Sequence, residues 1–120
     1  MYILYNAEVQ SMSPLNSKDA DHLFKAILSL KTLDECYLFF EDICTIKELQ
    51  DLTQRFQVAC QLDTGKNYNQ VSADTGASSA TISRVNKCLL YGGGGYRTVL
   101  DRLKEAEVLS NESGNSNSKA

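Results

Sequence analysis

Apolar residues recur at intervals of three and four along much of this chain, and that spacing constrains the fold more than any other feature. The clearest run lies on one helical stripe: Ile46, Leu49, Leu52, Phe56, Ala59 and Leu62. Such spacing puts side chains on one face of an α-helix, whereas a half-buried strand needs strict alternation. A single proline among 120 residues leaves helices uninterrupted. The sequence therefore predicts an all-α protein.

Capping residues divide the chain into about six helices. Ser, Thr and Asn side chains that can accept from free N–H groups stand at the expected starts: Asn16 or Ser17, Thr32, Thr45, Asn67 and Ser78. Glycines at 65 and 76 and the run Gly92–Gly95 mark expected ends and turns. The expected helices end near Lys31, Cys44, Gly65, Asp74, Leu90 and position 109.

The length suits one helical domain, expected over residues 16–109. Residues 1–15 form an N-terminal extension of uncertain order, and the Ser- and Asn-rich residues 110–120 are expected to be a disordered tail. The longest apolar run, Cys36–Phe40, is far shorter than the roughly 20 residues of a membrane span. No basic leader precedes it, so we expect a cytoplasmic protein without a membrane partner.

Catalytic and metal chemistry have little support. The only histidine is His22, so no Ser/His/Asp or Cys/His arrangement can be assembled without it. The cysteines at 36, 44, 60 and 88 form no C-x-x-C pair and are expected to be reduced and mostly buried. We therefore expect no enzyme, no metal site and no cofactor.

A helix-turn-helix is predicted at about residues 68–90. Gly76 suits a turn that needs positive φ, and Val71, Ala77, Ile82 and Val85 can pack the two helices together. The outward and N-terminal positions of the second helix then carry groups suited to bases or phosphates: Ser78, Ser79, Ala80, Ser83, Arg84 and Lys87, with Asn86 as an alternative to Lys87. A structural corner without DNA binding is the alternative.

Charge is uneven in a way that fits this hypothesis. Residues 64–104 carry six basic and two acidic side chains, whereas residues 1–63 carry five basic and ten acidic ones. A locally basic segment can meet a polyanion, although a solvated surface explains the same count.

Several segments resemble the tryptophan repressor, and more closely the YerC/YecD group of Trp-repressor-like proteins. The similar segments are Leu23–Lys31, Glu35–Asp42 and Thr75–Val85 continuing to Tyr91 and Gly92, and the resemblance covers about residues 18–104. It implies an intertwined homodimer that binds double-stranded DNA. It also adds Asn69 and Ser72 as DNA-binding positions, although these two residues and Leu90 stand where the repressor has basic side chains.

The resemblance also implies a ligand pocket, at positions corresponding to the repressor's contacts with tryptophan: Thr45, Arg55, Thr81, Arg84 and Cys88. The repressor has a glycine directly after the recognition-helix arginine, and here that position is Val85. A valine side chain takes up part of the space for an indole ring, so tryptophan is not expected to bind.

The expected function is a sequence-specific DNA-binding transcriptional regulator, a repressor, that acts as a homodimer without tryptophan. Its two recognition helices would read half-sites about 10 base pairs apart. Where this chain has Gly92–Gly95 the repressor has a more rigid segment, so the comparison predicts a DNA-binding head that is mobile without a ligand. Two alternatives remain: a protein-interaction module, and a repressor gated by another small anionic molecule held between Arg55 and Arg84.

Overall fold

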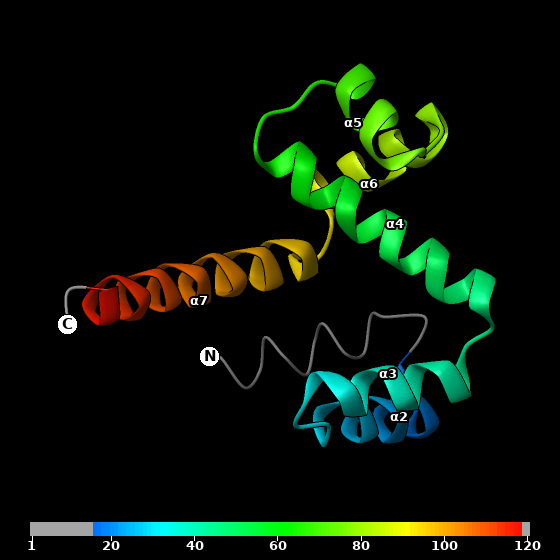
Figure 1. Ribbon diagram of the computed structural model, residues 1–120. Coiled ribbons are helices and arrows are strands. Elements are labelled where there is room, and N and C mark those ends of the chain that lie inside the picture. The colour runs from blue at the N-terminus through cyan, green and yellow to red at the C-terminus, as the bar shows by residue number, and fades with distance from the viewer. Residues whose placement is uncertain (1–15, 119–120) are drawn as a thin grey trace, which may run out of the picture. The chain divides into compact units, whose positions relative to one another are not determined.

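A computed structural model describes residues 16–118 of this protein, and in that range it contains α-helices and no strand (Figure 1). The helices are α2 (Lys18–Leu28), α3 (Leu33–Ile43), α4 (Ile46–Asp63), α5 (Tyr68–Thr75), α6 (Ser79–Tyr91) and α7 (Gly95–Ser118). The prediction of an all-α protein with about six helices is confirmed. The expectation about residues 1–15 falls outside the described residues.

Local hydrogen bonds explain where the helices begin. Ser17 Oγ accepts from the backbone N–H of Ala20 at 3.0 Å, and Thr32 Oγ1 accepts from that of Glu35 at 3.1 Å. Asn67 and Gln70 form a full capping box, each side chain accepting from the other residue's backbone N–H. These bonds satisfy N–H groups that have no partner inside the helix, which fixes each start to within a residue.

The expected single domain divides into two units, Met1–Ile46 and Lys47–Ala120. The first unit contains α2 and α3, and neither helix has a buried residue. Eight of its large apolar side chains are exposed instead: Leu23, Phe24, Leu28, Leu33, Tyr37, Leu38, Ile43 and Ile46. Phe39 and Phe40 are half-buried, and their rings meet edge to face with centroids 5.7 Å apart. Within the described residues this unit does not bury a core of its own.

The second unit has a compact core at the C-terminal half of α4, where α5 and α6 gather (Figure 1). Its buried members come from α4, α5, the turn and α6: Val58, Ala59, Val71, Ala77, Ile82 and Val85. Leu62 and Tyr96 pack against this cluster, and Leu100 of α7 is also buried. The predicted inward residues of the helix-turn-helix are therefore core residues.

Three expectations need correction. α7 continues to Ser118, although the composition predicts disorder from Ser110; adding a residue to an existing helix forms a hydrogen bond without a new nucleation step. The first helix ends at Leu28 instead of near Lys31, with Ser29 as its C-cap. Three cysteines are half-buried and Cys88 is exposed, so the cysteines are not mostly buried.

Among the described residues, no helix is long and apolar enough to cross a membrane.

Candidate DNA-binding surface and the adjoining pocket

The turn between α5 and α6 depends on Gly76. Its φ of +73° lies in the left-handed region, which side chains with a Cβ rarely adopt. Its backbone N–H donates to the carbonyl oxygen of Ser72 at 2.9 Å and closes α5. A Cβ added here would have its nearest neighbour at 3.9 Å, so backbone conformation and not space requires glycine.

Side-chain hydrogen bonds hold this turn in place. Ser72 Oγ donates to the carbonyl oxygen of Ala77 at 3.0 Å, and Thr75 Oγ1 accepts from the Ala77 N–H at 3.2 Å. Gln54 Nε2, on α4, donates to the carbonyl oxygen of Thr75 at 3.1 Å. These bonds join α4, α5 and the start of α6, so the angle between the two helices is set by specific contacts.

The outer surface of α5 and α6 carries every predicted DNA-binding residue. Asn69, Ser72, Ser78, Ser79, Ala80, Ser83, Arg84 and Lys87 are all exposed. The opposite face of α6 holds Ile82 and Val85 in the core. Asn86 is half-buried, so Lys87 is the more accessible of those two alternatives.

Two of these serines also have structural hydrogen bonds. Ser78 is the N-cap of α6, accepting from the Thr81 N–H at 3.2 Å and lying 3.1 Å from Thr81 Oγ1. Ser72 is engaged with Ala77, as described above. The hydroxyls of Ser72 and Ser78 therefore already form hydrogen bonds within the turn and the start of α6. Ser79 and Ser83 lie exposed along α6.

The electrostatics of this surface favour an anionic partner. The sequence of α6 contains Arg84 and Lys87 and no acidic residue. The acid on α5, Asp74, is paired with Lys66 at 3.1 Å. Neither Arg84 nor Lys87 forms an ion pair within the described part of the chain. Lys87 is exposed and available to phosphates, whereas the exposed Arg84 also lines a pocket between α4 and α6.

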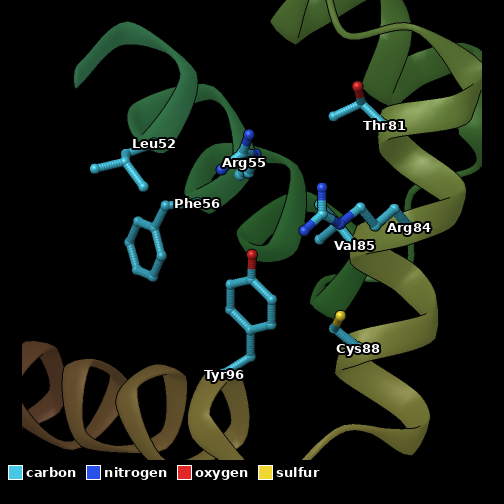
Figure 2. Close-up of a pocket in the computed structure, with 8 residues that line it drawn as sticks. All are labelled: Leu52, Arg55, Phe56, Thr81, Arg84, Val85, Cys88 and Tyr96. Carbon is cyan, nitrogen blue, oxygen red and sulfur yellow. The ribbon is translucent and has the colours of Figure 1, made fainter. Parts of the chain in front are cut away.

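A pocket of about 420 Å³ lies behind the recognition helix, between α4 and α6 (Figure 2). It brings together four of the five predicted ligand residues: Arg55, Thr81, Arg84 and Cys88. Val85 also lines it while remaining only 3% exposed. Thr45 belongs to the first unit, and its place at a ligand site stays a prediction.

Three further lining residues were missed by sequence reasoning: Leu52, Phe56 and Tyr96. A signal existed for the first two, because Leu52 is three residues before Arg55 and four before Phe56, so helical spacing makes it a neighbour of both. Nothing local marks Tyr96, which reaches the pocket from α7.

Tyr96 closes the pocket with a neutral phenol. Figure 2 shows its hydroxyl pointing from α7 into the space between α4 and α6. Burial raises the pKa of this hydroxyl and proximity to Cys88 adds to that, while Arg55 and Arg84 lower it. Both guanidinium groups are therefore close enough to affect the phenol electrostatically.

Among the described residues, no cluster of His, Cys, Asp or Glu could hold a metal ion.

Comparisons with known proteins agree with this arrangement. The chain is 54% identical over 96 residues to the uncharacterized protein YerC of Bacillus subtilis (strain 168), covering 80% of this chain and 92% of that protein. A TrpR-like protein from Eubacterium eligens has 53% identity and a TM-score of 0.73, covering 75% of this chain and 93% of its own. A candidate Trp repressor from Staphylococcus aureus has 46% identity, the same TM-score, and coverage of 75% and 90%. Since the model of the Trp repressor protein family matches residues 18–104, the chain belongs to the Trp repressor family, whose members are DNA-binding regulators.

Proposed function

We propose that this protein is a sequence-specific DNA-binding transcriptional repressor that acts as a homodimer and does not need tryptophan. The observation that carries the proposal is the helix-turn-helix of α5 and α6, whose whole set of candidate contact residues is exposed on a surface with two unpaired cations. Ser and Arg side chains there can bond base edges and phosphates, and the N-terminus of α6 attracts phosphate.

The homodimer is supported by the first unit. Neither α2 nor α3 has a buried residue, and eight large apolar residues between Leu23 and Ile46 are exposed. Apolar surface of this extent in a small helix pair is typical of an interface. A second copy is the partner we propose, because a dimer supplies the two recognition helices that a palindromic operator needs.

Independence from tryptophan is supported by Val85. Its side chain is packed into the core cluster and lines the pocket, so it cannot move aside without disturbing that core. An indole ring would have to share this space with it.

The first experiment selects bound fragments from sheared genomic DNA at physiological salt, with and without tryptophan, and sequences them. We expect a palindrome with half-sites about 10 base pairs apart, enriched equally in both conditions. Enrichment only with tryptophan would refute the independence. No enrichment would refute effector-independent DNA binding and favour a protein-interaction module or a repressor gated by an untested ligand.

A matched pair of variants tests the surface. Lys87→Ala should weaken binding to all sequences and lower the salt slope of a dimer by about 2, since each phosphate contact contributes about 0.9. Lys47→Ala removes the same charge from the start of α4, where the side chain is 84% exposed, and should leave the slope unchanged. Equal slopes for the two variants would contradict the proposed orientation of α6.

A repressor gated by a small anionic effector is the second candidate. It is favoured by Arg55 and Arg84, which line one pocket and make no ion pair in the described residues. Paired guanidinium groups hold carboxylates or phosphates well. Thermal unfolding with a panel of dicarboxylates and phosphate esters tests it, and no rise in Tm with any of them would count against it.

A further inference from the structure

We propose that Tyr96 is a positioning residue: its ring holds the recognition helix α6 against α4 from within the protein, so that the DNA-binding head is ordered without an effector. This inference rests on the proposed function for its consequence in DNA binding. The order of α6 in the free protein is a separate property that can be measured without DNA.

The ring occupies a position between the two helices. Tyr96 packs against a cluster to which α4 contributes Val58 and α6 contributes Val85. Figure 2 shows the side chain rising from α7 with Phe56 on one side and Cys88 on the other. A side chain in contact with both helices fixes their separation, because protein interiors are close-packed.

The ring also lines two pockets that are open to solvent. The pocket of about 420 Å³ and a second one of about 520 Å³ have three lining residues in common: Phe56, Cys88 and Tyr96. Removing the ring would join these spaces next to Val85 and leave α6 without support on that side. Cavities of this kind cost stability and allow neighbouring elements to shift.

Ion pairs anchor the helix that carries Tyr96. Arg97 makes two hydrogen bonds to Asp63 at the end of α4, with Nη1 2.8 Å from Oδ1 and Nη2 3.0 Å from Oδ2. Lys104 pairs with the same carboxylate, and Arg97 also pairs with Asp101. The start of α7 is thus tied to α4, and Tyr96 directly precedes Arg97 in the chain.

The backbone link between α6 and α7 does not supply this support. A Cβ added at Gly93, Gly94 or Gly95 would meet nothing within 4 Å, so these three positions lack side-chain packing. The hydrogen bonds of this link are local: the Gly92 N–H donates to the carbonyl oxygen of Cys88, and the Gly94 carbonyl accepts from the N–H of Thr98. Glycines in such open space leave the connection free to flex. Besides the buried Leu100, Tyr96 is the side chain of α7 that packs against the cluster shared by α4 and α6, so it relates α6 to the anchored start of α7.

Hydrogen exchange of the free protein tests the inference directly. We expect amides of α6 to exchange about 5- to 150-fold faster in Tyr96→Ala than in wild type, the range of a typical coupling between sites. Tyr96→Phe keeps the ring and should restore slow exchange. Tyr91→Ala removes a tyrosine that is 82% exposed at the end of α6 and serves as the control. Equal exchange in Tyr96→Ala and Tyr91→Ala would overturn the proposal.

Rescue by p-cresol separates positioning from a general loss of packing. This phenol can refill the space left in Tyr96→Ala, so it should slow exchange in α6 and raise affinity for the selected DNA, with no effect on Tyr91→Ala. If p-cresol neither slows exchange in α6 nor raises the affinity of Tyr96→Ala for DNA, the proposal is refuted. If Tyr96→Ala does not fold by circular dichroism, Tyr96→Leu takes its place, with the same expected direction. Wild-type protein that binds no specific DNA would refute the proposed function, while the exchange measurements would still decide the role of Tyr96.

Discussion

At the scale of single residues, Val85 links stability to ligand choice. It belongs to the buried cluster and also lines the pocket between Arg55 and Arg84. One side chain therefore supports the core and limits the shape of any molecule that enters. Most other residues that line the pocket do not belong to the buried cluster, so they affect only the shape of the pocket.

We expect Val85→Ala to lower the free energy of unfolding by about 2 kcal/mol, because it removes buried methyl groups. It should also enlarge the pocket, so that tryptophan raises the Tm of the variant and not of wild type. Val58→Ala makes the same change at a fully buried position that does not line the pocket. A Tm rise with tryptophan in wild type, or in Val58→Ala, would contradict this explanation.

A second prediction at this scale concerns Asp63. Hydrogen bonds from Arg97 and Lys104 lower its pKa from 3.8 to about 2. A carboxyl whose pKa is lower in the folded state stabilises the protein above its unfolded pKa, and that stabilisation is lost as the pH falls toward 2. Because both partners are about half exposed, the effect is screened to about 1 kcal/mol.

Asp63→Asn should therefore be less stable than wild type at pH 7. The difference should shrink as urea unfolding is repeated between pH 4 and pH 2. Asp51→Asn disrupts the exposed pair with Lys47 and should show a smaller change at every pH. A difference for Asp63→Asn that stays constant with pH would show that the ion pairs are not its source.

At the scale of elements, the helix-turn-helix depends on one backbone conformation. Gly76→Ala would place a Cβ on a residue with φ of +73°, which costs about 1 to 2 kcal/mol. We expect this loss in chemical denaturation, together with weaker DNA binding, because the turn sets the angle of α6. Gly93→Ala is the control, since its Cβ would meet nothing within 4 Å and its φ is not positive. Equal stability of the two variants would contradict the role assigned to Gly76.

At the scale of the whole molecule, the proposed homodimer would determine which DNA sites the protein can bind. The described part of the first unit has large exposed apolar side chains and no buried ones, which is typical of a surface that another protein surface covers. Under the proposal that partner is a second copy, which would also double the number of recognition helices.

Sedimentation equilibrium should therefore give twice the chain mass of 13.3 kDa. Leu28→Glu puts a charge on an apolar residue of α2 that is 82% exposed, and it should shift the equilibrium toward monomer. Tyr91→Glu makes the same change at a site of equal exposure on α6 and should remain dimeric. A wild-type monomer at micromolar concentration would contradict the proposed assembly.

The helices and the turn could be predicted from the sequence because their causes are local. The capping bonds of Ser17, Asn67 and Ser78 span three residues, and Gly76 is required by its own φ. The outward face of α6 follows in the same way from helical periodicity. Four residues of the candidate pocket could be placed only through the family resemblance.

Contacts between distant parts of the chain could not be predicted in this way. Asp63 and Arg97 are 34 positions apart, and no local pattern pairs them. Tyr96 reaches the pocket because α7 is anchored to α4. The continuation of α7 to Ser118 likewise contradicts its composition. The sequence by itself determined most helix starts, the turn and the exposed face of α6, because three- and four-residue spacings and caps act within one turn. Only the tertiary structure decided which side chains share the pocket, because such neighbours depend on how whole helices pack.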